Sequence, residues 1–178
     1  MGNFKEEIAL TQAIILDVDG VFTDGGIVPL PDGDFLRTYN AKDGYAIAYA
    51  IKQGMKIFII TGGRGATLKK RFEYLGVSEL HMNISDKVGV MRGIIERHGL
   101  DPARIIFMGD DVPDLECMRE VGIPVCPADA ASEILDVSVY VSEFAGGRGC
   151  VRDILEQVLR AQDKWAKDFK GVNTIHSA

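Results

Sequence analysis

The chain has 178 residues, of which 47% are hydrophobic and 26% are charged, and its formal net charge is -6. This length and apolar content suffice for one buried core and predict a single domain over residues 1–178. The negative charge argues against nucleic acid as a partner, because phosphate backbones are bound by clustered Lys and Arg. No apolar run approaches the roughly 20 residues that span a bilayer. The start MGNFKEEIALTQ lacks the basic segment of a signal peptide, so we expect a cytoplasmic protein without membrane contact.

Cysteines and histidines are few and scattered along the sequence. The three cysteines contain no CxxC pair, which favours buried reduced thiols over a metal site or a disulfide framework. The histidines lie too far apart in sequence to indicate a catalytic or zinc-binding set. These residues are Cys117, Cys126, Cys150, His81, His98 and His176.

Short apolar runs alternate with segments of helical period, and several of the helical segments end at a glycine. Runs rich in Ile, Val and Phe are typical of strands buried on both faces of a parallel sheet. The alternation predicts an α/β fold with a doubly wound, mainly parallel sheet. The expected strands are 13–17, 56–61, 104–109 and 138–141. The expected helices are 43–53, 65–75, 86–98, 114–121 and 151–168, the first four stopped by Gly54, Gly76, Gly99 and Gly122, with Asp86 as the N-cap of the third.

One segment interrupts this alternation. Residues 25–40 hold two short extended runs around Pro31-Asp32-Gly33, which predicts a β-hairpin arm. The arm follows the first strand directly, where loops at the carboxyl ends of strands build ligand sites. Residues 169–178 form a polar C-terminal tail.

Two carboxylates stand where the first strand opens into a glycine-bearing loop. Asp17 and Asp19 belong to the run DVDGVFTDG, at the sheet edge where α/β proteins bind ligands. Buried carboxylates are costly unless they are paired or bind a metal, and Mg²⁺ prefers such oxygen ligands. The alternative is a pair of turn-forming aspartates, since Asp-Gly is a common turn signal.

Three further motifs follow at strand ends or helix starts, each with an ordinary structural alternative. Thr61-Gly62-Gly63 offers a hydroxyl and backbone N–H groups suited to phosphate, although such turns are often only structural. Lys87 opens a helix and taken alone fits a surface lysine. The run GDDVPD places Asp110, Asp111 and Asp114 at another strand end, where aspartates also cap helices.

Taken together and in this order, the four motifs resemble those of the haloacid dehalogenase superfamily of phosphohydrolases. The resemblance covers nearly the whole chain and implies an enzyme of the phosphatase class. It implies that Asp17 is the nucleophile that forms an aspartyl-phosphate. It implies that Asp19 protonates the leaving group and then acts as base on the attacking water.

The same resemblance implies a magnesium site and a phosphate site. Mg²⁺ is expected on the Asp17 side chain, the Asp19 backbone carbonyl and Asp110. The phosphate is expected on a second set: Thr61, Gly62 and Lys87. Asp114 is expected to orient Lys87, and Asp111 to lie near the metal.

The intervals between the motifs leave no room for a cap domain, so we expect a capless form. Within that group the chain resembles the phosphatases of 3-deoxy-D-manno-octulosonate 8-phosphate in lipopolysaccharide synthesis, also through the hairpin and the loop GGRG at 146–149. This implies a small phosphosugar acid as substrate and a homotetramer joined through the hairpins, with neighbouring chains completing each site. The residues expected to contact the sugar are Asn40, Ala41, Lys42, Asp43 and Gly44, with Asp19 and Lys87 beside them and Arg71 on the substrate carboxylate.

Two positions depart from that pattern, since Gly63 and Ala48 stand where many relatives have Arg. A sister activity on a nine-carbon keto-deoxy-nonulosonate 9-phosphate tends to have Glu at position 63, and its absence favours the eight-carbon sugar. A different class of function is a phospho-accepting signalling protein or a non-catalytic subunit. The single DxD motif at the end of the first strand and the complete set of motifs argue against both.

Overall fold

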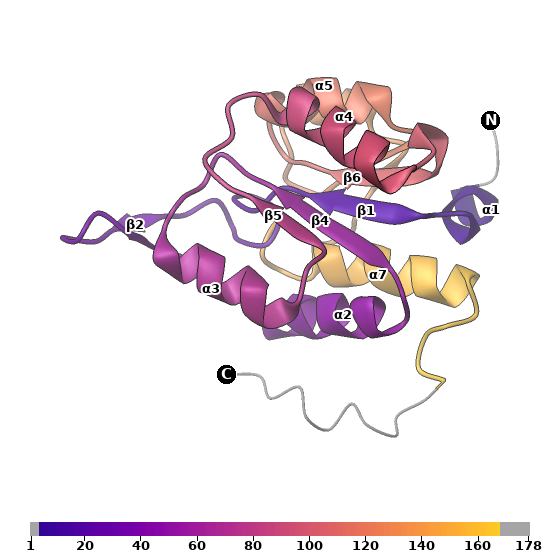
Figure 1. Ribbon diagram of the computed structural model, residues 1–178, viewed down its shortest axis with the longest axis horizontal. Helices are drawn as coiled ribbons and strands as arrows, with labels where there is room; N and C mark the ends of the chain where they lie inside the picture. The colour runs from indigo at the N-terminus through magenta and orange to yellow at the C-terminus, as the bar shows by residue number, and fades with distance from the viewer. Residues whose placement is uncertain (1–3, 168–178) are drawn as a thin grey trace.

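Strand β1 (Ala13–Leu16) is completely buried and lies inside a six-stranded parallel sheet of order β5-β4-β1-β6-β7-β8 (Figure 1). The computed structural model describes residues 4–167. In the sheet, Ile15 pairs with Phe58 of β4 on one side and with Phe107 of β6 on the other. The remaining strands are β4 (Lys56–Ile60), β5 (Glu79–His81), β6 (Ile105–Met108), β7 (Ile123–Cys126) and β8 (Tyr140–Val141).

Helices cover both faces of this sheet, as the alternating sequence pattern predicts (Figure 1). Ile14 and Leu16 of β1 belong to the core on one face, whereas Ala13 and Ile15 belong to the core on the other. The first face packs against α1 (Phe4–Ala9), α2 (Ala41–Lys52), α3 (Ala66–Leu75) and α7 (Cys150–Ala161). The second face packs against α4 (Lys87–His98), α5 (Leu115–Glu120) and α6 (Ser132–Val137). Two 3₁₀ turns, Pro102–Arg104 and Val112–Asp114, precede β6 and α5.

Most of the predicted elements are present, with four additions. The sequence analysis missed α1, β5, β7 and α6. Strand β5 has only three half-buried residues, and Pro124 sits inside β7, so neither shows a strand-like pattern. The predicted strand 138–141 pairs only over Tyr140–Val141.

The last helix is shorter than the predicted range 151–168, because it ends at Ala161. Asp163 has a left-handed φ of 58°, and the Lys164 N–H donates to the Leu159 carbonyl oxygen over 2.7 Å, which closes the final turn. The predicted tail 169–178, with Phe169 and His176, lies outside the described residues.

The helix caps follow the prediction except at one glycine. Gly76 and Gly99 have left-handed backbones at the C-caps of α3 and α4, and Asp86 accepts the Gly89 N–H over 2.9 Å as N-cap of α4. Gly122 has no positive φ. A Cβ there would lie 2.2 Å from the Ala103 carbonyl oxygen, so close backbone packing, not a cap, requires this glycine.

The predicted hairpin is present as an arm that projects from the sheet (Figure 1). It pairs β2 (Val28–Pro29) with β3 (Phe35–Leu36) in antiparallel fashion. Asp34 at its turn accepts the Thr67 N–H over 3.1 Å, which ties the arm to the start of α3. Ile27, Val28 and Leu36 are each about half exposed, so the arm presents apolar surface to solvent.

None of the helices between residues 4 and 167 combines the length and the apolarity that crossing a membrane needs. All three cysteines are free and buried, as predicted.

Candidate active site

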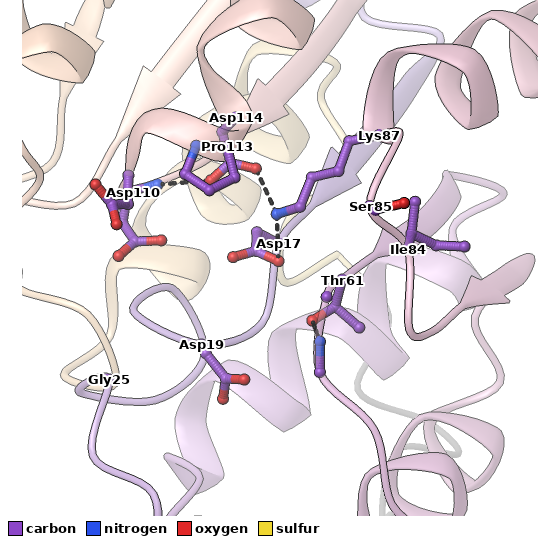
Figure 2. Close-up of a pocket in the computed structure, with 13 residues that line it drawn as sticks. Asp17, Asp19, Gly25, Thr61, Ile84, Ser85, Lys87, Asp110, Pro113 and Asp114 are labelled. Carbon is purple, nitrogen blue, oxygen red and sulfur yellow. Dashed lines mark hydrogen bonds and ion pairs between the residues drawn. The ribbon is translucent and has the colours of Figure 1, made fainter.

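A cavity of about 610 Å³ opens at the carboxyl ends of β1, β4 and β6 (Figure 2). This is the edge at which the sequence places its four motifs, and parallel strands bring their ends together there. The structure joins all of the predicted catalytic, metal and phosphate residues around this cavity. They are Asp17, Asp19, Thr61, Gly62, Lys87, Asp110, Asp111 and Asp114, with Gly25, Gly63, Ile84, Ser85 and Pro113 completing the lining.

Lys87 is buried at the centre of the site and bridges two carboxylates (Figure 2). Its Nζ lies 2.7 Å from Asp114 Oδ1 and 2.9 Å from Asp17 Oδ1. Burial by itself lowers the pKa of Lys87, but the two carboxylates outweigh it and raise the pKa to about 12. The lysine is therefore a fixed positive charge beside Asp17, and its contact with Asp114 is the one that the sequence analysis expected.

Three carboxylates gather beside this lysine. Asp17, Asp110 and Asp114 each offer an oxygen within 4.8 Å of the others. Burial and then mutual repulsion raise the pKa of Asp17 and of Asp110 to about 7, and burial raises that of Asp114. One lysine does not balance three neighbouring carboxylates, so a hard divalent cation fits this set. The residues present therefore suit Mg²⁺.

Glycines allow the acidic groups to approach so closely. Gly20 of the DVDG run has a φ of 88°, and a Cβ there would lie 1.9 Å from Asp110 Oδ2. A Cβ on Gly109 would lie 2.4 Å from the Cβ of Asp114. Asp114 Oδ2 also accepts the Asp110 N–H over 3.2 Å, which joins the two acidic residues of the GDDVPD run. These glycines are required by side-chain packing as well as by the turns.

The Thr61 hydroxyl is buried at the end of β4 and faces the cavity. Its backbone N–H donates to the His81 carbonyl oxygen over 2.9 Å, and its Oγ1 accepts the Gly63 N–H over 2.9 Å. In this hydrogen bond the Thr61 oxygen is the acceptor. The hydroxyl proton can therefore still be donated to a ligand. Gly62 is exposed on the cavity wall, as a backbone donor to phosphate must be.

Asp19 faces away from Asp17 (Figure 2), and its partner is a residue that the sequence analysis missed. Arg37, at the end of the hairpin arm, donates from Nε to Asp19 Oδ1 over 2.7 Å and from Nη2 to Oδ2 over 3.0 Å. The pKa of Arg37 is raised, chiefly by these hydrogen bonds. A single arginine in a hairpin carries no motif, so no sequence signal identified it.

No protein-family model matches the chain. It is 36% identical over 153 residues to the 3-deoxy-D-manno-octulosonate 8-phosphate phosphatase KdsC of Escherichia coli K12, covering 86% of this chain and 81% of that protein. The chain belongs to the KdsC family of phosphatases. The similarity to KdsC of Yersinia pestis is also 36%, over 159 residues, with coverage of 89% and 85%.

Solved structures of this family share the fold. The Yersinia pestis enzyme has a TM-score of 0.87 at 36% identity, with 90% of this chain and 86% of that chain covered. The enzyme of Moraxella catarrhalis, solved with magnesium, phosphate and KDO, has a TM-score of 0.85 at 28% identity, with coverage of 89% and 91%. The chain is therefore a phosphatase of the haloacid dehalogenase type without a cap domain, and its acidic cluster fits the metal found in that relative.

Of the residues expected to contact the sugar, Asp19 and Lys87 line the cavity, and the other six do not line it within one chain of this phosphatase. The six are Asn40, Ala41, Lys42, Asp43, Gly44 and Arg71. Asn40 is the N-cap of α2, where its Oδ1 accepts the Lys42 N–H over 2.8 Å. Ala41 and Lys42 are exposed on the first turn of α2.

Asp43 and Gly44 have structural roles that the sequence did not reveal. Asp43 is fully buried, and its Oδ1 accepts the Arg152 N–H over 2.7 Å at the start of α7. Burial raises the pKa of Asp43 to about 6. Gly44 leaves room for Arg71, since a Cβ there would lie 2.3 Å from Arg71 Nη2. Within one chain these residues join α2 to α7 and α3, and their contact with a sugar remains a prediction.

The GGRG loop packs directly against the DVDG loop of the phosphatase site. A Cβ on Gly146 would lie 2.0 Å from the Gly20 carbonyl oxygen, and one on Gly147 would lie 2.7 Å from the Thr23 carbonyl carbon. Two glycines are therefore needed for backbone contact next to the cavity, which explains why this run is so rich in glycine.

Two of the histidines come together away from the cavity, which the sequence analysis did not expect. His81 Nε2 lies 2.7 Å from Glu79 Oε2, and His98 Nε2 lies 2.6 Å from Glu79 Oε1. Glu79 also accepts from Arg97 over 2.6 Å. Burial opposes these contacts, but together they lower the pKa of Glu79 to about 2. The cluster holds the edge strand β5 against α4, so these two histidines have a structural role, in line with the prediction that they are not a catalytic or zinc-binding set.

Proposed function

We propose that this phosphatase hydrolyses 3-deoxy-D-manno-octulosonate 8-phosphate in a magnesium-dependent reaction, as a step in lipopolysaccharide precursor synthesis. The observation that carries the proposal is the grouping of Asp17, Asp110, Asp114 and Lys87 around one cavity, in a chain whose relatives bear the name of that activity. A carboxylate next to a fixed cation, with further carboxylates for a metal, is an arrangement suited to phosphoryl transfer.

In the first step, an Asp17 carboxylate oxygen attacks the phosphorus of the substrate. The bond between phosphorus and the leaving oxygen breaks, and its electron pair remains on that oxygen. Protonated Asp19 gives its proton to this oxygen, so that the sugar leaves as an alcohol. The products are the free sugar acid, the Asp19 carboxylate and an aspartyl-phosphate on Asp17.

In the second step, the Asp19 carboxylate takes a proton from water while the water oxygen attacks the phosphorus. The bond between phosphorus and the Asp17 oxygen breaks, with its electron pair returning to the carboxylate. Inorganic phosphate leaves, and both aspartates regain their starting forms after phosphate release and proton exchange with solvent.

Residues around the cavity stabilise the negative charge on the transferred phosphoryl group. The Thr61 hydroxyl, the Gly62 N–H and Lys87 bind the phosphoryl oxygens, and Asp114 keeps Lys87 in place. Asp17, Asp110 and the Asp19 carbonyl oxygen would hold Mg²⁺, which would supply positive charge to offset that of the carboxylates and the phosphate. Asp111 is exposed at the rim and stands beside this set.

Recognition of the sugar requires more than one chain in this proposal. Between residues 4 and 167 no cap covers the cavity, and most of the residues expected to contact the sugar do not line it in the single chain. We propose a homotetramer in which the exposed apolar arms pack together and each arm helps to wall a neighbour's site. The cytoplasmic location also stays a prediction.

A small set of phosphate esters tests this function. Phosphate release in the presence of Mg²⁺ is measured for the eight-carbon substrate, for the nine-carbon 9-phosphate, for arabinose 5-phosphate and for a phosphoserine peptide. We expect the highest kcat/KM for the eight-carbon acid. Preference for the nine-carbon acid would correct the substrate, and preference for the peptide would overturn the assignment to sugar phosphates.

A further inference from the structure

The hairpin arm reaches the proposed acid through a single buried guanidinium. The Arg37 side chain is 3% exposed, and it holds both oxygens of Asp19, whose side chain is 30% exposed. Figure 2 shows the Asp19 carboxylate directed away from Asp17 and Lys87. The carboxylate is thus not aimed at Asp17, and the ion pair with Arg37 holds it in that orientation.

This ion pair lies next to the predicted phosphate site. A Cβ added at Gly63 would lie 3.0 Å from Arg37 Nη2, from Asp19 Oδ2 and from Thr61 Oγ1. The guanidinium, the carboxylate and the hydroxyl thus surround one point, and any side chain at position 63 would crowd all three. The glycine at position 63 is what makes room for the arm's arginine beside Thr61.

Asp19 cannot simply rotate away from Arg37. A buried guanidinium that loses its carboxylate keeps only a neutral partner, here the Arg64 carbonyl oxygen at 3.3 Å from Nη1, which is unfavourable. The nearby Asp34 is already engaged, because its carboxylate accepts the Phe35 and Thr67 N–H groups over 2.7 Å and 3.1 Å. Release of Asp19 therefore requires another anion to take its place on Arg37.

We propose that Arg37 is a positioning residue that holds Asp19 away from Asp17 until an anionic group on the substrate's leaving alcohol replaces Asp19 on the guanidinium. The inference rests on the proposed function, because it concerns the proton that Asp19 gives to the leaving group. Asp19 is a carboxylate while Arg37 holds it, and it takes up this proton from solvent once it is released. The exchange makes Arg37 a determinant of specificity that acts on the chemical step as well as on binding.

The chemistry of the exchange points to a carboxylate. Asp19 projects away from Asp17 and Lys87, and with Arg37 it borders the phosphate site at Thr61 and Gly63, where the part of a substrate beyond its phosphate would lie. A guanidinium binds carboxylates through two parallel hydrogen bonds, so one carboxylate can replace another with little net change in energy. A sugar acid phosphate carries such a group, whereas a neutral sugar phosphate has nothing to offer Arg37. In this proposal the one substrate carboxylate therefore lies on Arg37, in place of the Arg71 contact expected from the sequence.

The test compares two substrates in two variants. Arg37→Ala and Arg37→Lys are assayed with the eight-carbon acid phosphate and with neutral arabinose 5-phosphate, with Mg²⁺ present. For Arg37→Ala we expect KM for the acid substrate to rise and kcat for the neutral substrate to rise, so that the ratio of their kcat/KM values falls about tenfold or more. Arg37→Lys keeps the positive charge but cannot form two parallel hydrogen bonds to one carboxylate. It should give an intermediate ratio of the two kcat/KM values.

Two controls separate positioning from stability. Arg64→Ala removes an exposed arginine whose side chain lies over Phe35 of the same arm, and it should leave the ratio unchanged. In an Asp19→Asn background, Arg37→Ala should no longer raise turnover of the neutral substrate, because the group that it restrains is no longer an acid.

The outcomes distinguish this inference from the proposed function. Parallel losses for both substrates in both Arg37 variants would show that Arg37 only maintains the fold or the arm, and would overturn the inference. A ratio of the two kcat/KM values that is unchanged from the wild type would also overturn the inference. Absence of turnover by the wild-type protein with either substrate would instead contradict the proposed function itself.

Discussion

Asp17→Asn should stabilise the metal-free protein at pH 8 while removing its activity. The pKa of Asp17 is raised from 3.8 to about 7, first by burial and then by repulsion from Asp114. Keeping Asp17 ionised in the fold at pH 8 therefore costs about 4 kcal/mol, since each tenfold change in proton affinity is about 1.4 kcal/mol. Asparagine has the same shape without the charge. The attraction of Lys87 is already contained in this pKa, because Lys87 lowers it against burial and Asp114, so the expected gain is about 4 kcal/mol.

A gain of about 4 kcal/mol corresponds to a Tm about 8–16 °C higher for a chain of this size. The size of this gain depends on pH. The contribution of protonated Asp17 to wild-type stability is fully present below its unfolded pKa of 3.8 and is lost as the pH rises through its folded pKa of about 7. At pH 4.5 Asp17 is protonated in the folded protein and the advantage of asparagine is only about 1 kcal/mol, so most of the difference in Tm should disappear.

Thermal unfolding followed by circular dichroism in excess chelator, at pH 8 and at pH 4.5, measures both effects. Asp136→Asn is a matched control, because Asp136 is an exposed carboxylate of α6, and it should change stability by less than about 0.5 kcal/mol. An Asp17→Asn protein that melts below the wild type at pH 8 would contradict the electrostatic account of the site. A gain in Tm of the same size at both pH values would also contradict this account.

Three further predictions follow from the site and the arm. Gly20→Ala should lower kcat/KM at least about tenfold, because its Cβ would displace the Asp110 carboxylate, and normal kinetics in this variant would refute the packing argument. Asp19→Asn should turn over slowly and accumulate phosphoenzyme, detectable by intact mass, if dephosphorylation is the step most impaired; a slow variant that carries no phosphate would shift the main role of Asp19 to the first step. Deleting residues 27–37 should convert a species of about four times 19.5 kDa into smaller ones with reduced turnover, and a fully active wild-type monomer would rule out the tetramer.

The sheet and the motif residues could be predicted because their signals are local. Completely apolar runs such as Ala13–Leu16 indicate buried parallel strands, and acidic residues at the ends of such strands must meet at one edge. Strand β7 was missed for an equally local reason, because Pro124 interrupts an apolar run only four residues long.

The contacts that could not be predicted join segments far apart in the chain. Arg37 meets Asp19 only because the arm folds back over the end of β1, and Asp43 caps α7 from the first turn of α2. In both cases an ordinary charged residue gains its role from tertiary packing. Neither its spacing in the sequence nor its residue type indicates that role. The histidines around Glu79 belong to the same category, since β5 and α4 bring them together.

Phosphate release from 3-deoxy-D-manno-octulosonate 8-phosphate tests the central claim most directly. It should be measured for the wild-type protein with Mg²⁺, for the wild-type protein in excess chelator, and for Asp17→Asn with Mg²⁺. The account predicts turnover only in the first case, with a loss on the order of a thousandfold or more when the carboxylate of Asp17 is replaced. Substantial hydrolysis by Asp17→Asn, or full activity in the chelator, would contradict an Asp17 nucleophile working beside a magnesium ion.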